Sequence, residues 1–527
     1  MAYYYRLAML PQDEERIHQL NYKTFVEEIP QHAPNEDGMM VDRFHAENTY
    51  VLCMKEEELV GMIALRSVRP FSLDEKIGPI EDHLANLPNY PVEIRLLAVD
   101  PAHRTGRAFF GMMQALVNWC LKAGFDAAVI SGTVRELKLY RKMGYVQFAE
   151  PVGTEEAKYV PMIMTMDTYE QGAAGRMNLP MVNLLPGPVS IAHNVRQAMM
   201  KEPLSHRSPV YARLLKSVTA QLRELTGANH VQLLQGTGTL ANDAVAAQLS
   251  RVSGRGLILV NGEFGQRLTD HAQRFGLSFD CLEKEWGESF SLDEVERLLR
   301  LGGYDWIWLT HLETSTGVVN DLAGITALCH AHGIRVAVDC ASSLGIIPVD
   351  LTKVDFASSV SGKGLASYAG FALVFHIDAL EPDDALPRYL DIGLYASKAG
   401  IPFTQSSNLL AAMHVALGNL LNQTKEHLEH IAASANRIRK GIRELDYALL
   451  TSEEATKSSV ITLVLPEGDS SKRLGDDLFV NGFRVHYESK YLVERNWLQI
   501  AVMEPLEDAE VERLLEVLKL LKVHRPY

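Results

Sequence analysis

Short apolar runs recur along the whole chain, and between them lie longer segments in which apolar residues return every three to four positions. Runs of the first kind are typical of buried strands, and segments of the second kind are typical of amphipathic helices. Up to residue 167 the pattern predicts strands at 49–54, 59–65, 92–99 and 127–130 and helices at 14–27, 109–123 and 134–142.

Beyond residue 180 the alternation becomes regular, and each strand-like run is followed by a segment long enough for a helix. The predicted strands are 231–234, 256–260, 306–310, 335–338, 356–360 and 371–374. A repeated strand–helix–strand order predicts an α/β fold with a mostly parallel sheet covered by helices. The last part, 460–521, has the pattern of a smaller lobe of helices and strands.

The segment 168–180 separates these two regions. It is rich in small residues, includes the run Gly172-Ala173-Ala174-Gly175, and shows no apolar period. Such a composition is typical of a linker. We therefore expect one domain at 1–167 and a second at 181–527, since 527 residues are too many for one ordinary core.

Composition and charge exclude several function classes. Apolar residues make up 47% of the chain, but no apolar run approaches the roughly 18 residues of a membrane-spanning helix. The N-terminus reaches charged residues at Asp13 without a signal-peptide core, so we expect a cytoplasmic protein. A net charge of −15 argues against a nucleic-acid partner. The five cysteines form no CxxC pair and no metal-ligand spacing, so we expect no metal site.

Three short motifs in the second domain suit the cofactor pyridoxal 5'-phosphate (PLP). Asp339 closes a predicted strand, where an acid can keep a pyridine nitrogen protonated, and Lys363 follows the next strand and offers an amine for the cofactor aldehyde. The turn 236–239 (Gly-Thr-Gly-Thr) opens a predicted helix, and free N–H groups at a helix start bind phosphate. Each motif alone is ordinary, because most such acids are caps and most lysines are solvated. Their order along the chain indicates PLP.

Six motifs in this domain resemble the class V aminotransferases. The wording is most similar to 2-aminoethylphosphonate–pyruvate transaminases, then to alanine–glyoxylate aminotransferases, and it covers about residues 181–525. The motifs are Asn183-Leu184-Leu185-Pro186-Gly187-Pro188, Ser205-His206-Arg207-Ser208, Leu234-Gln235-Gly236-Thr237-Gly238-Thr239, Asn261-Gly262-Glu263-Phe264-Gly265-Gln266-Arg267, His311-Leu312-Glu313-Thr314-Ser315-Thr316-Gly317 and Val338-Asp339-Cys340-Ala341-Ser342-Ser343.

This resemblance implies a type I PLP-dependent transferase fold and a homodimer whose active site lies at the subunit interface. By the same resemblance, Lys363 forms the Schiff base with PLP, Asp339 pairs with the pyridinium nitrogen, and Phe264 stacks on the ring. The remaining implied cofactor-binding residues are Thr237, Gly238 and Thr239 for the phosphate, Thr314 near the phenolic oxygen, and Thr404 for the phosphate of the neighbouring subunit.

One position departs from the resembled family. Those transaminases bind the substrate carboxylate through an arginine in a late Arg-Ile-Gly motif, and this chain has Gln499 at the matching place. A glutamine donates hydrogen bonds without a charge. Either Arg484, Lys490 or Arg495 substitutes, or the substrate lacks a carboxylate there. The reaction is then open between transamination and a PLP-dependent lyase reaction.

The first domain resembles the GNAT acyltransferases. The basic loop after the predicted strand 92–99 precedes a helix, and such a loop binds the phosphates of an acyl-CoA or of an acyl carrier protein. The resemblance assigns that task to Arg104, Gly106, Arg107 and Ala108. It also makes Tyr140 the acid that protonates the leaving thiolate and Glu93 the base or water-positioning residue.

The opening helix of this domain, around 21–28, is similar to that of the autoinducer synthases and N-acyl amino acid synthases. Together the two resemblances predict a bifunctional enzyme, which transaminates a small amine, amino acid or keto acid and acylates an amine. The alternative is a PLP-dependent lyase or transaminase whose GNAT-like domain only binds or senses acyl-CoA.

Overall fold

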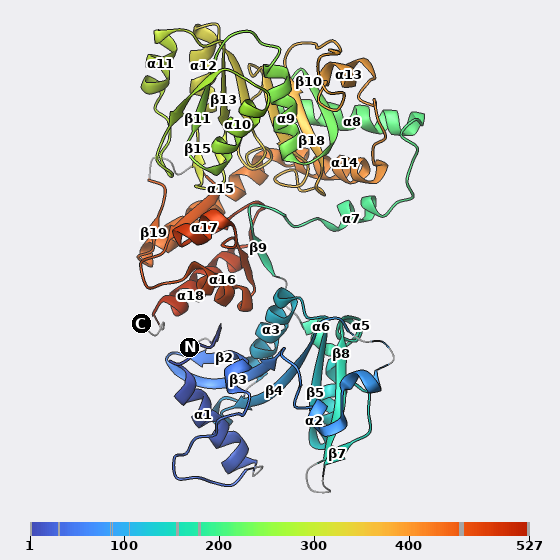
Figure 1. Ribbon diagram of the computed structural model, residues 1–527, viewed down its shortest axis with the longest axis vertical. Coiled ribbons are helices and arrows are strands. Elements are labelled where there is room, and N and C mark those ends of the chain that lie inside the picture. The colour runs from blue at the N-terminus through green and yellow to red at the C-terminus, as the bar shows by residue number, and fades with distance from the viewer. Residues whose placement is uncertain are drawn as a thin grey trace. The chain divides into compact units, whose positions relative to one another are not determined.

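The computed structural model describes residues 3–29, 32–84, 86, 88–104, 106–153, 158–177, 181–452 and 458–523. The chain forms two compact units (Figure 1). Unit 1 comprises Met1–Val182 with Arg473–Arg484 and Glu516–Tyr527, and unit 2 comprises Asn183–Lys472 with Val485–Leu515. In the part of the chain that is described, no helix is both long and apolar enough to cross a membrane.

Unit 1 is built on a mixed sheet in the order β1-β2-β3-β4-β5-β8-β6, and β7 also pairs with β8. Its strands are β1 (Tyr4–Leu7), β2 (Thr49–Lys55), β3 (Glu58–Arg66), β4 (Pro91–Val99), β5 (Ala127–Thr133), β6 (Val146–Gln147), β7 (Val152–Gly153) and β8 (Lys158–Thr165). The parallel ladder between β4 and β5 is confined to Pro91–Glu93 against Ala127–Val129. The carboxyl-terminal halves of these two strands therefore run on beyond their shared ladder.

Helices cover both faces of this sheet. On one face, α3 (Gly106–Ala123) buries Ala108, Met112 and Ala115 at helical spacing against β2 and β3, and α4 (Leu137–Met143) packs beside it. On the other face, α2 (Asp74–Ile77) lies near a smaller core. Alternate residues of β5 point to opposite sides, as a strand requires: Ala128 and Ile130 enter the first core, and Ala127 and Val129 the second.

Three predictions for unit 1 differ in detail from the structure. The helix expected at 14–27 is α1 (Glu14–Tyr22), which continues as a π-helical segment at Lys23–Glu28. The helix expected at 134–142 begins as a 3₁₀ turn at Val134–Glu136. Part of the expected linker is helical, as α5 (Met166–Gln171) and α6 (Ala173–Met177), because Thr165 and Thr168 form a capping box at the start of α5. Residues 178–180 lie outside the described residues.

Unit 2 contains a seven-stranded sheet in the order β10-β18-β17-β16-β13-β11-β12. Its strands are β10 (His230–Gly236), β11 (Gly256–Val260), β12 (Phe279–Glu283), β13 (Trp306–Thr310), β16 (Arg335–Asp339), β17 (Phe356–Val360) and β18 (Gly370–His376). All neighbours are parallel except those of β18, which is antiparallel to both β10 and β17. The predicted mostly parallel α/β fold is confirmed.

Each face of this sheet is buried under a separate layer of helices. Leu257 and Leu259 point to the layer of α8 (Pro209–Thr226), α11 (Leu292–Leu301), α12 (Leu322–Ala331) and α14 (Ser407–Leu421). Ile258 and Val260 point to that of α9 (Gly238–Leu249), α10 (Glu263–Arg274) and α13 (Ile392–Ser397). The strands are therefore apolar on both sides, which explains why they read as continuous apolar runs.

Shorter elements complete the chain, and some of those in its C-terminal part fall in the segments Arg473–Arg484 and Glu516–Tyr527 of unit 1. Two short strands, β14 (Leu312–Glu313) and β15 (Val318–Val319), form a hairpin after β13. The C-terminal part adds the three-stranded sheet β19-β20-β22 and the pair β21-β9. The further elements are β9 (Val182–Leu184), α7 (His193–Met199), α15 (Thr424–Glu444), β19 (Ala448–Leu449), β20 (Val460–Val464), α16 (Ser471–Val480), β21 (Phe483–Val485), α17 (Lys490–Arg495), β22 (Trp497–Ala501) and α18 (Asp508–Val523).

Candidate active sites

Lys363 lies in the loop that joins the antiparallel strands β17 and β18. Ser361 fastens this loop, because its hydroxyl donates to the carbonyl oxygen of Tyr368 (2.7 Å) and accepts from the N–H of Phe371 (3.1 Å). A Cβ on Gly364 would lie 2.4 Å from the carbonyl oxygen of Leu344, so only glycine lets the loop pack this closely. The backbone that carries Lys363 is therefore held from both sides.

The amine of Lys363 is bound by a short relay of hydroxyls. Its Nζ donates to Ser342 Oγ at 2.8 Å, and the same oxygen accepts a hydrogen bond from Thr314 Oγ1. Burial lowers the pKa of Lys363, while the carboxylates of Asp339 and Glu313 act in the opposite direction. An amine that loses its proton more readily is a better nucleophile toward a carbonyl carbon.

Asp339, at the end of β16, is a fixed and largely buried anion. Its Oδ2 accepts from Asn242 Nδ2 at 2.9 Å, and its Oδ1 accepts from the N–H of Ala341 at 2.8 Å. The amide oxygen of Asn242 in turn accepts from Ser358 Oγ. Asn242 therefore orients Asp339, and its only sequence signal is its place on the helix that begins at the 236–239 turn.

The start of α9 has the features of a phosphate site. Thr237 precedes the helix with no side-chain cap on its first turn, and the side chains of Thr237 and Thr239 are exposed. A Cβ on Gly238 would lie 3.1 Å from Val360 Cγ1, so glycine allows the turn to approach β17. Free N–H groups and two hydroxyls at a helix N-terminus suit a phosphate group.

Phe264 and Thr314 lie close to Lys363, as the resemblance implied. The Nζ of Lys363 is 5.4 Å from the centroid of the Phe264 ring, and the guanidinium carbon of Arg267 is 4.9 Å from the same centroid. Arg267 also forms an ion pair with Glu263 one turn earlier on α10 (2.9 Å). The carboxyl edge of the sheet thus gathers an amine, an acid, an aromatic ring and hydroxyls, the set that PLP requires.

Gln499 lies near this site, and its amide group is hydrogen-bonded to other residues of the protein. It is fully buried, and its Nε2 donates to the carbonyl oxygens of Thr314 (2.8 Å) and Ser315 (3.0 Å) and to Thr462 Oγ1 (2.9 Å). Its Oε1 lies 3.0 Å from His486 Nδ1, and burial lowers the pKa of that histidine. This geometry argues for a support of the 314–316 backbone rather than for the substrate-carboxylate ligand expected from the sequence.

Thr404 lies in the segment between α13 and α14. It lines a cavity of about 690 Å³, and the described residues that share this lining are His206, Arg207, Ser208, Pro209, Ala212, Tyr389, Ile401, Pro402 and Phe403. None of the residues gathered around Lys363 is in that set. The residues that follow Thr404 contact β10 just before the 236–239 turn: Gln405 Nε2 donates to the carbonyl oxygen of Leu233 (2.9 Å), and the N–H of Ser406 donates to Gln235 Oε1 (2.9 Å).

In unit 1, one arginine of the basic loop before α3, Arg104, is paired with an acid. Arg104 donates from Nε to the carbonyl oxygen of Val99 (3.0 Å) and forms a two-pronged ion pair with Glu28. That pair lowers the pKa of Glu28. Gly106 and Arg107, the first two residues of α3, are exposed, and Ala108, which follows them, is buried.

Tyr140 lies on α4, and its ring meets that of Tyr145 edge to face at 6.3 Å. Burial raises the pKa of Tyr140, although a hydrogen bond with Thr133 opposes this shift. The phenol therefore keeps its proton at neutral pH, as a group that donates a proton must.

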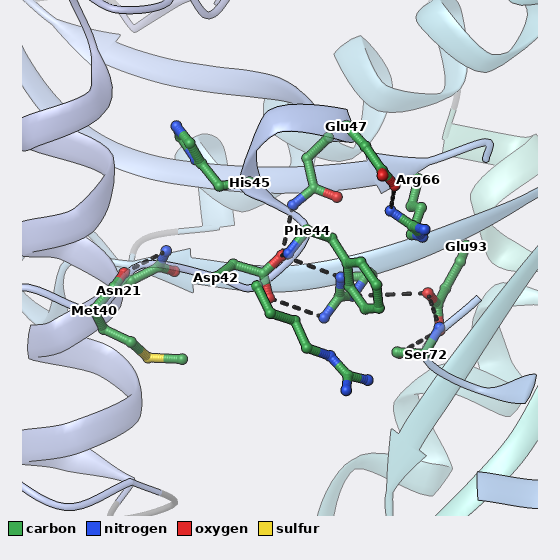
Figure 2. A network of polar contacts seen from close by, with 12 residues as sticks. Asn21, Met40, Asp42, Phe44, His45, Glu47, Arg66, Ser72 and Glu93 are labelled. Atoms are coloured by element: carbon green, nitrogen blue, oxygen red, sulfur yellow. Dashed lines mark hydrogen bonds and ion pairs between the residues drawn. The ribbon is translucent and has the colours of Figure 1, made fainter. Parts of the chain in front are cut away.

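Glu93 belongs to a buried polar network (Figure 2), while its neighbours on β4, Val92 and Ile94, face the core that α3 covers. Its carboxylate accepts from the N–H and the hydroxyl of Ser72 (2.9 and 2.6 Å) and from the N–H of Leu73 (3.0 Å), and it is only 1% exposed. Arg95 lies beside it, 3.7 Å away, and pairs with Asp42. This geometry argues that Glu93 positions the 72–73 turn. It argues against the expected role as a base, because both carboxylate oxygens already accept hydrogen bonds from the protein.

The guanidinium groups of this network gather on one ring. Arg66, Arg95 and Arg43 lie 3.8, 4.7 and 4.5 Å from the centroid of Phe44, and Arg66 also pairs with Glu47. Figure 2 shows Phe44 between Asp42 and Arg66. The network ties the 42–48 segment to the sheet. Among the described residues no group of three or more His, Cys, Asp or Glu side chains could hold a metal ion.

Comparisons with known proteins match two separate segments of the chain. Residues 194–382 match the family model of class V aminotransferases, and residues 16–167 match that of the N-acyl amino acid synthase FeeM. The chain is 30% identical over 311 residues to the soluble hydrogenase 42 kDa subunit of Anabaena cylindrica, which covers 55% of this chain and 79% of that protein. It is 35% identical over 247 residues to the 2-aminoethylphosphonate–pyruvate transaminase of Pseudomonas fluorescens, covering 44% of this chain and 67% of the relative.

Solved structures show the same fold for the second domain. The alanine–glyoxylate aminotransferase of Nostoc sp. superimposes with a TM-score of 0.59 and 27% identity over 66% of this chain and 96% of that chain. An aspartate aminotransferase from Thermus thermophilus gives a TM-score of 0.59 and 26% identity over 65% and 99%. The chain is therefore an enzyme that belongs to the class V aminotransferase family and carries an N-terminal domain of the N-acyl amino acid synthase type.

Proposed function

We propose that the protein is a bifunctional enzyme that transaminates a small amino or keto substrate with PLP and forms an N-acyl amide from an acyl thioester. The observation that carries the first half is the convergence of Lys363, Asp339, Phe264 and Thr314 at one edge of the sheet. The second half rests on the match of residues 16–167 to an N-acyl amino acid synthase family and on Tyr140.

The residues of unit 2 fit PLP in charge and in shape. Lys363 would hold the aldehyde carbon, Asp339 the ring nitrogen, Phe264 the ring face, and the 237–239 turn the phosphate. When bound, PLP supplies an electron sink that makes the carbon next to a substrate amine acidic. Lys363 Nζ would be the group that accepts the proton from that carbon, and burial, which lowers the pKa of this amine, favours the neutral form that the role needs.

The amino donor has no preformed arginine clamp at position 499. The amide of Gln499 donates to backbone carbonyls, and burial lowers the pKa of its neighbour His486, which disfavours the charged form of that histidine. Among the described residues, Arg267 is the one arginine whose charge is found to act on the Lys363 amine, and Arg267 is already paired with Glu263. We therefore propose a donor with weak or absent recognition of an α-carboxylate.

The acyl half would receive its donor beside α3 and α4. Arg107 begins α3, and Lys138, Arg141 and Lys142 are exposed on α4, in a chain whose net charge is −15. This local excess of cations suits the phosphate of a phosphopantetheine arm and an acidic carrier protein. The transfer step requires loss of an ammonium proton from the amine and return of a proton to the departing sulfur, and Tyr140 would supply the second.

Fusion of the two activities makes physical sense if they share an intermediate. An amine released by one domain meets the other at a raised effective concentration. Specific contacts favour a second candidate, in which the first domain only binds or senses acyl-CoA. These contacts are the pairing of Arg104 with Glu28 and the sequestration of Glu93 by Ser72.

Product analysis separates the two candidates. The wild type, Lys363→Ala and Tyr140→Phe are offered amino donors with pyruvate or glyoxylate, and acyl-CoA or acyl carrier protein, and products are identified by mass spectrometry. We expect Lys363→Ala to lose amino transfer, and with it the amide made from the transferred amine, and Tyr140→Phe to lower amide formation by about 10²–10⁴-fold while keeping amino transfer. Thioester binding without any amide product in the wild type would establish the sensing alternative.

A further inference from the structure

Glu313, at the end of the short strand β14, is a fully buried carboxylate with four hydrogen-bond donors. Its Oε2 accepts from the N–H of Gly265 (2.9 Å), and its Oε1 accepts from the N–H of Phe264 (3.3 Å) and of Ser315 (3.1 Å) and from the hydroxyl of Ser315. The hydroxyl oxygen of Ser315 also accepts from the N–H of Glu263 (3.0 Å). Directly or through Ser315, Glu313 thus satisfies the first three N–H groups of α10.

The pattern of donors requires the ionised form of Glu313. A protonated carboxyl group must donate to an acceptor, and the four contacts that surround it in the described structure are all donors. The proton of Ser315 points at Glu313, because its oxygen already receives the N–H of Glu263. Burial raises the pKa of Glu313, while the four hydrogen bonds oppose that shift and the helix dipole favours the anion.

The contact also depends on a glycine. A Cβ on Gly262 would lie 2.5 Å from Glu313 Cγ and 2.5 Å from Ser315 Oγ. Any other residue would therefore push the carboxylate away from the start of α10. The sequence places this glycine immediately before Glu263 and Phe264, the residues that Glu313 serves.

Two residues expected to contact PLP are carried by the segments that Glu313 joins. Phe264 is in the first turn of α10, with its ring 5.4 Å from Lys363 Nζ, and Thr314 follows Glu313 directly and donates to Ser342. The carboxylate also acts electrostatically on Lys363, in the same direction as Asp339. One buried anion is therefore linked to the ring face, to the hydroxyl relay and to the amine.

We propose that Glu313 is a positioning residue of the PLP site, whose carboxylate fastens the first turn of α10 to the 313–316 turn and so sets Phe264 and Thr314 against the cofactor. The inference rests on the proposed PLP site and adds to it a residue that does not itself touch the ring. As a fixed negative charge near Lys363, Glu313 also stabilises the protonated form of the nitrogen that links lysine and cofactor.

The test compares the wild type with Glu313→Gln and, as a control, with Glu296→Gln, whose carboxylate pairs with Arg300 on the surface of α11. Glu313→Gln keeps the shape but turns an NH₂ group toward backbone donors. We expect its Kd for PLP to rise about tenfold or more. The pH midpoint of the visible absorption of bound PLP should fall, because a nearby anion is lost. Cooperative melting of the cofactor-free protein checks that the fold persists, and Glu296→Gln should match the wild type throughout.

Wild-type values of both the Kd and the midpoint in Glu313→Gln would overturn the proposal. If Glu313→Gln does not melt cooperatively, Ser315→Ala is tested in its place. The Ser315→Ala substitution removes one donor to Glu313 and the acceptor of the Glu263 N–H. We expect Ser315→Ala to weaken PLP binding several-fold, and an unchanged Kd would again overturn the proposal. A wild type that binds no PLP would instead overturn the PLP half of the proposed function itself, which is a different result.

Discussion

The Nζ atom of Lys363 donates a hydrogen bond of 2.8 Å to Ser342 Oγ, which also receives the hydroxyl of Thr314. The amine is thereby aimed at a fixed point beside Phe264 and Asp339. We expect borohydride reduction of the PLP-loaded protein to leave one stable adduct, on Lys363, found by peptide mass spectrometry. Lys363→Ala should retain PLP only without a covalent bond, and Lys353→Ala, on the surface, should keep the adduct. An adduct on another lysine would refute the assignment.

Gln499 gives a second prediction, on stability. Gln499→Leu leaves the carbonyl oxygens of Thr314 and Ser315 without their donor inside the protein, which should cost about 1–3 kcal/mol in the free energy of unfolding. Urea denaturation measures this difference, and the exposed Gln273→Leu on α10 serves as the control. If Gln499→Leu is as stable as the wild type but loses only substrate affinity, the glutamine is a substrate ligand after all.

Thr404 gives a third prediction, on assembly. We propose, from the family resemblance, that Thr404 contacts the PLP phosphate of a neighbouring subunit, so that a complete site needs a second copy of the chain. We expect a dimer in sedimentation experiments and a loss of about 1.5–3 kcal/mol of PLP binding free energy in Thr404→Ala. Thr219→Ala on α8 should bind normally. A monomer that binds PLP tightly would contradict the shared site.

The stability of the protein should fall in mild acid. Burial lowers the pKa of both His311 and His376 to about 4, from an ordinary value near 6.5. The unfolded chain therefore takes up more protons than the folded one between these values, so the stability is complete above about pH 6.5 and is lost as the pH falls toward 4.

Each of these histidines should contribute a loss of about 2 kcal/mol between pH 7 and pH 5. Urea denaturation midpoints are measured at both pH values for the wild type and for His376→Gln. Buried carboxyl groups, which act in the opposite direction, are the same in both proteins, so the difference between the two pH dependences is the contribution of His376. The variant should show the weaker dependence on pH. Identical pH dependence in the two proteins would show that His376 titrates normally.

The sequence predicted the framework well because the framework follows from burial. The strands 256–260 and 306–310 are apolar on both faces, so their bounds could be read directly and agree with β11 and β13. Asp339 and Lys363 follow neighbouring strands, and the carboxyl ends of such strands share one edge of a sheet. Their approach was therefore predictable without any coordinates.

The sequence did not predict hydrogen-bond partners that are far apart in the chain and meet only in the folded structure. Asn242, Ser342 and Glu313 have no pattern of their own, because a hydrogen bond between residues far apart in the chain depends on side-chain directions. For the same reason, sequence could not show that Ser72 occupies the carboxylate of Glu93 or that the amide of Gln499 faces backbone carbonyls.

The central claim is that an amine handled by the PLP domain is acylated by the first domain. The most direct test offers the wild type ¹⁵N-labelled amino donors, pyruvate or glyoxylate as acceptor, and acyl-CoA or acyl carrier protein, and follows ¹⁵N into the amide by mass spectrometry. We expect a ¹⁵N amide whose nitrogen lies on the carbon skeleton of the acceptor, and we expect its loss in both Lys363→Ala and Tyr140→Phe. An amide on the unchanged donor skeleton, formed equally well by Lys363→Ala, would contradict the coupling of the two activities.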